Sequence, residues 1–257
     1  MRYETLFTTI FKAIRRPNGR KLRRMERTLE RQITPVLEKQ RKHILEKARS
    51  LFNEKQTNSQ KIDIILEIVD ETNDEIVDAT MSNASRAMLL GASYRIQSLE
   101  LAKIGISFNL GHPLAERYLE HDRRVLLESV LPQTTKDQIK PILLDALQTG
   151  QSYDATAEKI SSAFSLSPER SQMIAVNEIG NAYEEGNMIP MRDLADQGNK
   201  VEKYWSTVQD DKVTPTHTQN EDDGWIGIDD TFSGTGDERA PASDNPNCRC
   251  TILWRFD

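Results

Sequence analysis

Cysteine, aromatic residues and long apolar runs are all scarce in this chain of 257 residues. Two cysteines that lie two positions apart cannot build a disulfide framework, which argues against a disulfide-stabilised secreted domain. No apolar run approaches the roughly 20 residues that a membrane-spanning helix needs. Residues 1–14 also lack the order of a signal peptide, because the main basic run follows the apolar residues. We therefore expect a soluble protein made in a reducing compartment, with no membrane span.

Charge is distributed unevenly along the chain, although the net charge is only −6. Residues 1–50 contain 15 lysines and arginines against 5 glutamates. The segment from Gln209 to Asn245 holds ten acidic residues, which only Lys212 and Arg239 oppose. A basic N-terminal segment in an otherwise acidic chain indicates that this segment binds a polyanion or an acidic protein surface.

Helical periodicity covers most of the chain up to residue 198. An apolar stripe from Leu22 to Ile33 predicts a helix that restarts or kinks at Thr34-Pro35, where threonine would cap and proline would take the first helical position. Farther along, Thr134 or Thr135 predicts a capping box for a new helix. Gly150 is expected to end that helix in a left-handed conformation.

Ser152 and Ser167-Pro168-Glu169 are expected to begin two further helices. The pattern then changes, because Val201 to Val208 alternates and is rich in β-branched and aromatic residues, as is typical of a strand. Cys250 to Phe256 has the same pattern. The stretch between them, Gln209 to Asn247, is too irregular for a helix, and a loop of that length usually indicates function or mobility.

The predicted fold class is mainly α with a small C-terminal α+β module. A helical N-terminal region would be followed by a compact, loop-rich module that contains the strands. We expect four consecutive segments: a basic amphipathic helical segment (1–53), a helical region (54–107), the helical part of a larger domain (108–198) and an α+β module with the Cys-Arg-Cys sequence (199–257).

Seven cations lie within thirteen residues near the start of the chain and form what we call the basic segment: Arg15, Arg16, Arg20, Lys21, Arg23, Arg24 and Arg27. At 3.6 residues per turn, the last few arginines would share one broad helix face. Phosphate contacts from such a face are blind to sequence and sensitive to salt. No aromatic residues interleave with the cations, so base stacking is not expected. DNA or RNA, an acidic protein partner and a merely solvated helix face all remain open.

Cys248 and Cys250 would point the same way if they lie on a strand, so the two thiols could act together. A disulfide between residues this close would be strained. His217 with Asp210 or Asp211 could complete a zinc site, yet one Cys-x-Cys pair and a distant histidine make a weaker pattern than paired Cys-x-x-Cys motifs. We therefore favour two small residues that pack the module, with metal binding and redox chemistry as alternatives. No cofactor is predicted.

Asp211 and His217 raise the question of catalysis, since a carboxylate can orient a histidine as a general base. A structural role is at least as natural, with Asp210 or Asp211 closing the turn after the strand. The sequence contains no nucleophile motif, phosphate-binding glycine loop or paired metal carboxylates. We therefore expect no enzymatic activity.

Aromatic residues gather in the same module: Tyr204, Trp205, Trp225, Phe232 and Trp254. A module of roughly 55 residues needs large side chains to bury enough apolar area, so these residues are expected to form its core. The alternative is that some of them anchor an interface with a partner protein.

The order of these residues resembles the closing signature of the phage head-morphogenesis family, the Mu F-like minor capsid proteins. The residues that carry the resemblance are Trp205, Asp211, His217, Phe232, Cys248, Arg249 and Cys250, with Pro246-Asn247 directly before the cysteines. Upstream, Gly150-Gln151-Ser152 and the segment from Met173 to Gly186 are similar to the helical part of that family. Together the similar residues extend from about Phe108 to Trp254.

This resemblance implies a non-enzymatic minor head protein that is incorporated during head assembly at or near the portal. Its implied role is in DNA packaging, retention or ejection, in contact with portal, capsid or scaffold proteins and with phage DNA. The implied location is the virion head, and the host cytoplasm during assembly. Two other classes stay open: an enzyme or toxin-like module with a His/Cys site, and a free nucleic-acid-binding protein.

Overall fold

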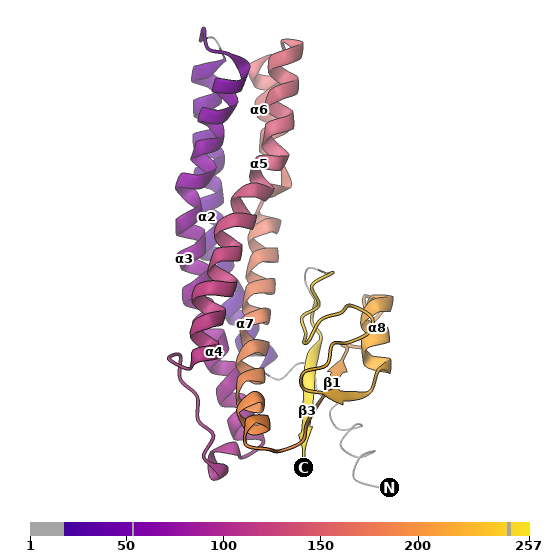
Figure 1. The fold of residues 1–257 in the computed structure, drawn as a ribbon. Helices are drawn as coiled ribbons and strands as arrows, with labels where there is room; N and C mark the ends of the chain where they lie inside the picture. Colours follow the sequence, from indigo (N-terminus) through magenta and orange to yellow (C-terminus); the bar gives the residue numbers. More distant parts are fainter. Residues whose placement is uncertain (1–17, 53, 246–247) are drawn as a thin grey trace. The chain divides into compact units, whose positions relative to one another are not determined.

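The computed structural model describes residues 18–52, 54–245 and 248–257, which form long helices and one three-stranded sheet (Figure 1). The expected mainly helical protein with a small C-terminal α+β module is confirmed. None of the helices in these ranges is both long enough and apolar enough to cross a membrane. The elements in chain order are α2 (Gly19–Leu51), α3 (Asn58–Ser98), η1 (Leu101–Ile104), α4 (Pro113–Glu116), the π-helical turn η2 (Arg117–Arg123), α5 (Arg124–Thr149), α6 (Tyr153–Ser161), η3 (Phe164–Leu166), α7 (Pro168–Asp196), β1 (Val201–Ser206), α8 (Pro215–Asp222), β2 (Trp225–Gly227) and β3 (Thr251–Phe256).

Close contacts divide the chain into two units. Within the described ranges, unit 1 comprises residues 18–25, 84–116, 176–245 and 248–257, and unit 2 comprises residues 26–52, 54–83 and 117–175. The helices α2, α3 and α7 each contribute residues to both units. The four consecutive segments expected from the sequence remain a proposal about its organisation.

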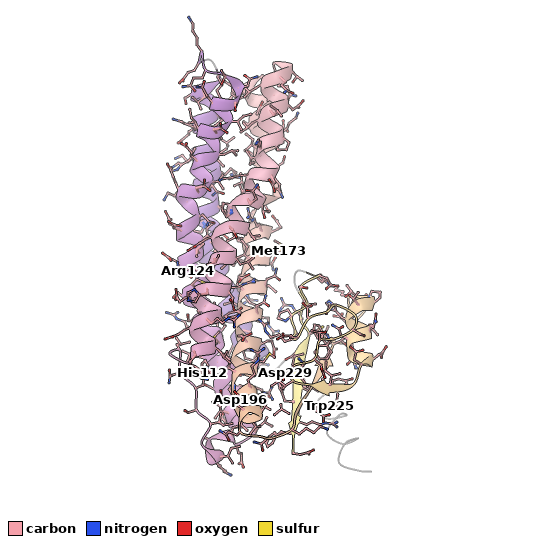
Figure 2. All side chains as sticks on the ribbon, viewed as in Figure 1. His112, Arg124, Met173, Asp196, Trp225 and Asp229 are labelled. Atoms are coloured by element: carbon pink, nitrogen blue, oxygen red, sulfur yellow. The ribbon has the colours of Figure 1, made fainter. Side chains whose placement is uncertain are left out.

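Unit 2 is a helical assembly around an aliphatic core. Its buried residues come from α2, α3, α5, α6 and η3: Ile44, Ala48, Leu51, Ile62, Ile65, Leu66, Val69, Ile139, Leu143, Ile160 and Leu166. Ion pairs lie on its surface, such as Lys39 Nζ to Glu75 Oε1 at 2.6 Å and Arg124 to Asp78 at 3.1 Å (Arg124 is labelled in Figure 2). Exposed pairs of this kind contribute little stability, so the apolar stripes hold the unit together.

Several predicted helix ends are confirmed. Gly150 ends α5 in the left-handed conformation with φ of 69°, and the Ser152 hydroxyl caps α6 by accepting a hydrogen bond from the backbone N–H of Ala155 at 3.3 Å. Helix α7 begins at Pro168, and Ser167 Oγ accepts from the backbone N–H of Arg170 at 3.4 Å. Short polar side chains at these positions satisfy N–H groups that have no partner inside the helix.

The predicted restart of a helix at Thr34-Pro35 and the predicted helix start at Thr134 or Thr135 are wrong, whereas the alternative of a kink at Pro35 stays a prediction. Helix α2 continues through Thr34-Pro35, and the Thr34 hydroxyl donates to the carbonyl of Glu30 at 2.8 Å. Likewise α5 continues through the predicted capping box, where Thr134 Oγ1 donates to Val130 O at 2.8 Å and Thr135 Oγ1 to Leu131 O at 3.3 Å. A threonine hydroxyl can bond a carbonyl four residues back inside a helix, so it does not always begin one.

The sheet belongs to unit 1 and has the order β2-β1-β3, with both pairs antiparallel. The predicted strands are confirmed as β1 and β3, which pair from Val201 with Phe256 to Ser206 with Thr251. The prediction missed α8 and β2, which lie inside the segment expected to be an irregular loop. Both are short, and neither has a clear period-2 or period-3.6 pattern in the sequence.

Close packing of α3 against α7 in unit 1 depends on two glycines. A Cβ atom on Gly186 would lie 2.1 Å from the carbonyl oxygen of Met88, and one on Gly91 would lie 2.0 Å from that of Tyr183. Both contacts are with backbone, which cannot move aside as a flexible side chain would. The glycine at the end of the family-like segment Met173 to Gly186 therefore has a packing role.

Candidate functional site

Three side chains that are far apart in the sequence meet in unit 1. His217 lies in the first turn of α8, where Pro215 takes the first helical position, and Cys248 and Cys250 directly precede β3. Nδ1 of His217 is 3.8 Å from Sγ of Cys248 and 3.6 Å from Sγ of Cys250. The two cysteines are buried while Arg249 between them is exposed, so they share one face as predicted.

The other imidazole nitrogen of His217 contacts a carboxylate. Nε2 is 3.0 Å from Oδ1 of Asp244, whose second oxygen accepts a hydrogen bond from Thr216 Oγ1 at 2.9 Å. A carboxylate can only accept, so Nε2 carries the hydrogen. In the neutral imidazole Nδ1 then holds a lone pair, and this lone pair faces the two thiols.

The two thiols share a hydrogen bond that makes their proton affinities unequal. This bond from the Cys250 thiol lowers the pKa of Cys248 to about 6, with a smaller contribution from the positive charge that His217 can carry. The same bond, together with burial, raises the pKa of Cys250. The pair therefore loses its first proton readily and holds its second, which is the behaviour of two thiols around one shared proton.

Aromatic side chains surround this group on one face of the sheet. The Trp205 ring lies 5.7 Å from the His217 ring and 5.2 Å from the Phe232 ring, measured between centroids. Trp205, Phe232 and Trp254 are buried, as predicted for a core. Tyr204 and Trp225 lie half-buried on the other face, 5.5 Å apart between centroids (Trp225 is labelled in Figure 2).

A buried lysine lies on the same sheet face. Lys203 alternates along β1 with Val201 and Trp205, so its side chain points into the core. Its Nζ donates to the carbonyl of Ile228 at 2.6 Å and lies 5.6 Å from the Phe232 ring centroid. Burial lowers the pKa of Lys203 to about 8.

Asn220 organises the segment that follows α8. Its Oδ1 accepts hydrogen bonds from the backbone N–H groups of Gly234 and Thr235, at 2.8 and 3.1 Å. A Cβ on Gly234 would lie 2.1 Å from the carbonyl oxygen of Thr216, so this turn contacts the first turn of α8 directly. These contacts fix α8, and with it His217, against the turn at Gly234 and Thr235.

Helix α7 is linked to the sheet module by two acidic residues of the family-like segment. Thr251 Oγ1 donates to Glu184 Oε1 at 2.6 Å, and Arg239 Nε donates to Glu185 Oε2 at 2.8 Å. Glu184 is buried at 1 % exposure, where an unpaired carboxylate would be costly. Both contacts lie within unit 1 and connect β3 and the loop before it to the helix.

The carboxylate beside His217 is thus Asp244 and not Asp211. Asp211 is exposed, while Asp210 Oδ1 accepts from the backbone N–H of Lys212 at 3.0 Å and closes the turn after β1. Sequence reasoning missed Asp244, Asn220 and Glu184. No local signal singles out Asp244, which is one of ten acidic residues in its stretch and lies 27 positions from His217.

The basic segment falls partly outside the described residues, which exclude Arg15 and Arg16. Its other five members, Arg20, Lys21, Arg23, Arg24 and Arg27, lie on α2 and are exposed. Leu22 and Leu29 on the same helix are buried, so the cations lie outside the apolar stripe, as predicted.

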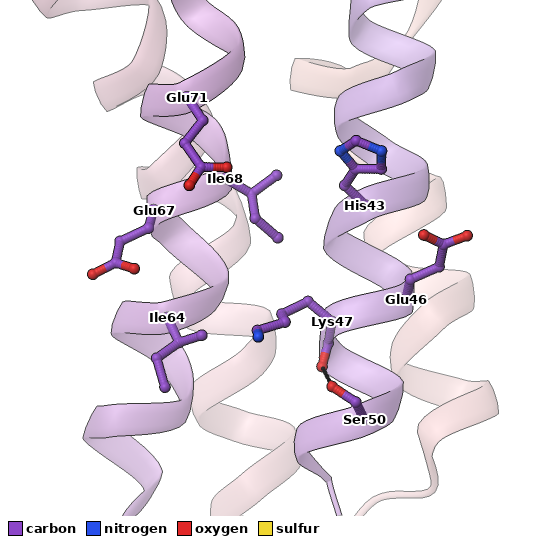
Figure 3. Close-up of a pocket in the computed structure, with 8 residues that line it drawn as sticks. All are labelled: His43, Glu46, Lys47, Ser50, Ile64, Glu67, Ile68 and Glu71. Carbon is purple, nitrogen blue, oxygen red and sulfur yellow. Dashed lines mark hydrogen bonds between the residues drawn. The ribbon is translucent and has the colours of Figure 1, made fainter.

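A hollow lies between α2 and α3 in unit 2 (Figure 3). Its lining residues are exposed or half-buried: His43, Glu46, Lys47, Ser50, Ile64, Glu67, Ile68 and Glu71. The dashed contact in the close-up is a hydrogen bond from Ser50 Oγ to the carbonyl of Lys47, at 2.9 Å within α2. The polar groups do not converge on one point, so this hollow has no apparent chemistry.

Comparison with known proteins identifies the domain that holds the His217 group. Residues 137–253 match the family model described as Phage Mu protein F like protein. This segment, a little under half of the chain, is similar to the Mu F-like family of phage head proteins. The match runs from α5 to β3 and includes every residue of the predicted signature. No curated protein and no solved structure matches the chain.

The Mu F-like family is associated with head morphogenesis and with other components of the phage head. The structure explains several positions of the family-like pattern in physical terms. Trp205, His217, Phe232, Cys248 and Cys250 pack together, and Gly186 permits the close approach of α3 and α7.

Proposed function

We propose that the chain is a minor phage head protein that acts in head assembly at or near the portal, without catalysing a reaction. The observation that carries this proposal is the Mu F-like segment, residues 137–253, in which five of the seven signature residues are buried together: Trp205, His217, Phe232, Cys248 and Cys250. Buried residues of this kind hold a module in shape and are not displayed to a partner. The recognition surfaces then lie elsewhere on the chain.

A non-enzymatic role is supported by how well the His217 group is covered. Cys248 and Cys250 are 5 % and 2 % exposed, and His217 is 2 % exposed. A nucleophile that acts on a protein or nucleic acid has to reach its substrate, and thiols at these exposures do not. An enzyme or toxin-like module with a His/Cys site is therefore the weaker alternative.

For the partner of the basic segment we favour the DNA that passes through the portal. Five of its cations are exposed on α2. If four of these cations contact phosphates, the logarithm of the binding constant should fall with the logarithm of salt concentration by about 3 to 4 units from this region alone. The acidic rim of a portal or capsid protein is the alternative partner for the same face.

The proposal is tested by quantifying the chain in purified phage heads before and after DNA release. We expect a low and constant copy number in filled heads, and loss on release if the protein leaves with the genome. Retention after release would instead assign it to packaging or head stability. Absence of the chain from heads would contradict the proposed function.

A variant with four arginines of the basic segment changed to glutamine tests the contact with DNA. The changed residues are Arg20, Arg23, Arg24 and Arg27. We expect weaker binding to all DNA sequences and a salt slope lower by about 3 to 4. The matched control changes four exposed lysines outside the basic segment to glutamine: Lys103, Lys140, Lys200 and Lys212. An equal loss of DNA affinity in the arginine variant and the lysine control would contradict a specific role of the basic segment. Unchanged DNA binding in the arginine variant would favour a protein partner.

A further inference from the structure

We propose that His217, Cys248 and Cys250 bind one Zn²⁺ ion, with a water molecule as the fourth ligand. The three donor atoms lie within 4.8 Å of one another, and all three residues are buried. The sequence favours packing alone for the two cysteines, but the structure also brings His217 to both of them.

The distances agree with the edges of a tetrahedron around zinc. Typical lengths of about 2.3 Å for Zn–S and about 2.0 Å for Zn–N place a nitrogen and a sulfur ligand about 3.5 Å apart. The Nδ1 atom of His217 lies 3.6 and 3.8 Å from the two sulfur atoms. The ion therefore needs only small side-chain movements to enter.

The histidine already has the orientation that a metal ligand needs. Histidines that bind zinc commonly donate their second ring N–H to a carboxylate, which fixes the tautomer and makes the ligating nitrogen more basic. Asp244 accepts that N–H at 3.0 Å and is itself oriented by Thr216 at 2.9 Å. Its contact leaves the lone pair of Nδ1 directed at the thiols.

Charge balance also favours the ion. When Zn²⁺ binds, the thiols of Cys248 and Cys250 release their two protons to solvent, and the two thiolates neutralise the dication. The buried ligand set then carries no net charge, so the desolvation cost of a lone buried ion is avoided. The remaining negative charge is that of Asp244, whose side chain is 39 % exposed and therefore in contact with water.

A thiol nucleophile activated by the His217–Asp244 pair is the competing interpretation of the same contacts. One nucleophile would need one thiol beside the imidazole, whereas here both thiols are at similar distances from Nδ1. Soft thiolates and an imidazole around one point are the ligand set that selects zinc among common divalent ions. Because His217 lies in α8 and the two cysteines directly precede β3, the ion would join these two elements.

The test uses the full chain, purified with Zn²⁺ present and then dialysed against metal-free buffer. We expect close to one equivalent of zinc by elemental analysis. X-ray absorption at the zinc edge should give two sulfur ligands at about 2.3 Å and lighter ligands at about 2.0 Å. Well under a tenth of an equivalent, or a shell of oxygen and nitrogen alone, would overturn the proposal.

Variants assign the ligands and the supporting carboxylate. Cys248→Ser and His217→Ala should each lose the bound zinc, and Asp244→Asn should weaken zinc affinity by about 10- to 100-fold, as for other carboxylates behind a histidine ligand. Asp229→Asn is the matched control, because Asp229 is an exposed carboxylate in the same acidic stretch (Figure 2). Equal affinity in Asp244→Asn and Asp229→Asn would contradict the role of Asp244.

A thiol-alkylation measurement on the unmodified chain separates the metal site from simple packing even if the variants fail to fold. Zinc should slow the alkylation of Cys248 and Cys250 at least tenfold, and a chelator should reverse this protection. Alkylation at the same rate with zinc and with chelator would contradict metal binding.

Discussion

The two units of this protein use different means to hold long helices together. Gly150, a helix end, is the one glycine of unit 2, and the other eleven glycines belong to unit 1. All three tryptophans, Trp205, Trp225 and Trp254, are also in unit 1. Unit 2 packs aliphatic stripes, whereas unit 1 depends on close backbone approach and aromatic packing.

Both units also bury polar groups. Unit 1 buries Glu184, Lys203, His217 and Asn220, each with a specific partner. Unit 2 buries several polar residues too, among them Gln40, which donates to Thr72 Oγ1 at 2.6 Å, and Arg170, which donates to neutral oxygens. Specific polar contacts fix one arrangement but tolerate little change, whereas apolar stripes tolerate many substitutions. We therefore expect substitutions at buried polar and glycine positions in unit 1 to be the most damaging.

The largest effect should come from removing the last strand. Deleting Thr251 to Asp257 removes the whole partner of β1 on one side, together with the buried side chains of Ile252 and Trp254. Loss of a buried tryptophan alone costs about 3–5 kcal/mol, so the module should unfold. Limited proteolysis should then cleave readily between Val201 and Cys250 while unit 2 stays resistant. Deleting Asp257 alone is the control, and resistance equal to that of the full chain would contradict this architecture.

A somewhat smaller effect is expected for Gly186→Ala. The new Cβ would lie 2.1 Å from the carbonyl oxygen of Met88, so α3 and α7 would have to separate. We expect the free energy of unfolding to fall by about 3 kcal/mol, despite the better helix propensity of alanine. Urea denaturation measures the loss.

The matched control for this helix contact is Gly19→Ala, also in a helix, where the nearest atom to the new Cβ is a flexible arginine nitrogen at 3.7 Å. This variant should raise the free energy of unfolding slightly, by less than about 1 kcal/mol. Similar stability changes in the two glycine variants would show that the close approach of α3 and α7 is not required.

In unit 2, Arg170→Met should cost about 2 kcal/mol. Arg170 donates to Thr135 Oγ1 at 2.5 Å, Ser165 O at 2.6 Å and Leu131 O at 2.8 Å, and methionine would leave these oxygens without that donor. Burial of the charge is itself unfavourable and lowers the pKa of Arg170 to about 10. Because methionine removes this burial cost, the loss of stability is moderated. Urea denaturation compares it with Lys140→Met, an exposed position where we expect a change within about 0.5 kcal/mol. No change in the free energy of unfolding for Arg170→Met would mean that unit 2 does not need the buried contacts of Arg170.

The smallest effect concerns the pH dependence contributed by Lys203. Its pKa is about 8 in the folded chain, below the ordinary 10.5, because burial disfavours the charge. Above pH 8 the unfolded state therefore binds more protons than the folded state, and stability should rise with pH. We expect a gain of about 1 kcal/mol between pH 8 and 9.5 relative to Lys203→Met. Parallel pH curves for the two proteins would contradict this assignment.

The helices were largely predictable from sequence, because their information is local. Apolar stripes and the caps at Ser152 and Ser167 depend on residues within a few positions of one another. The wrong boundaries at Thr34 and Thr134 have a local cause too, since the same hydroxyl can begin a helix or bond a carbonyl inside one. Packing of α2 and α5 on both sides of these threonines keeps each helix continuous.

The candidate site was predictable only in part. His217, Cys248 and Cys250 stand out because their residue types are rare in this chain. Asp244 does not, because carboxylates are common around it and its partner lies 27 positions away. Contacts over such separations depend on how β1, α8 and β3 pack, and no periodic pattern encodes that arrangement.

The most direct test of the contrast between the units is hydrogen exchange, measured by mass spectrometry on the full chain with zinc and after chelation. If buried specific contacts around His217 hold the module of unit 1, chelation should speed exchange in α8 and β3. Exchange in unit 2, for example between residues 124 and 149, should not change. Equal acceleration in both units, or no change in α8 and β3, would contradict the account.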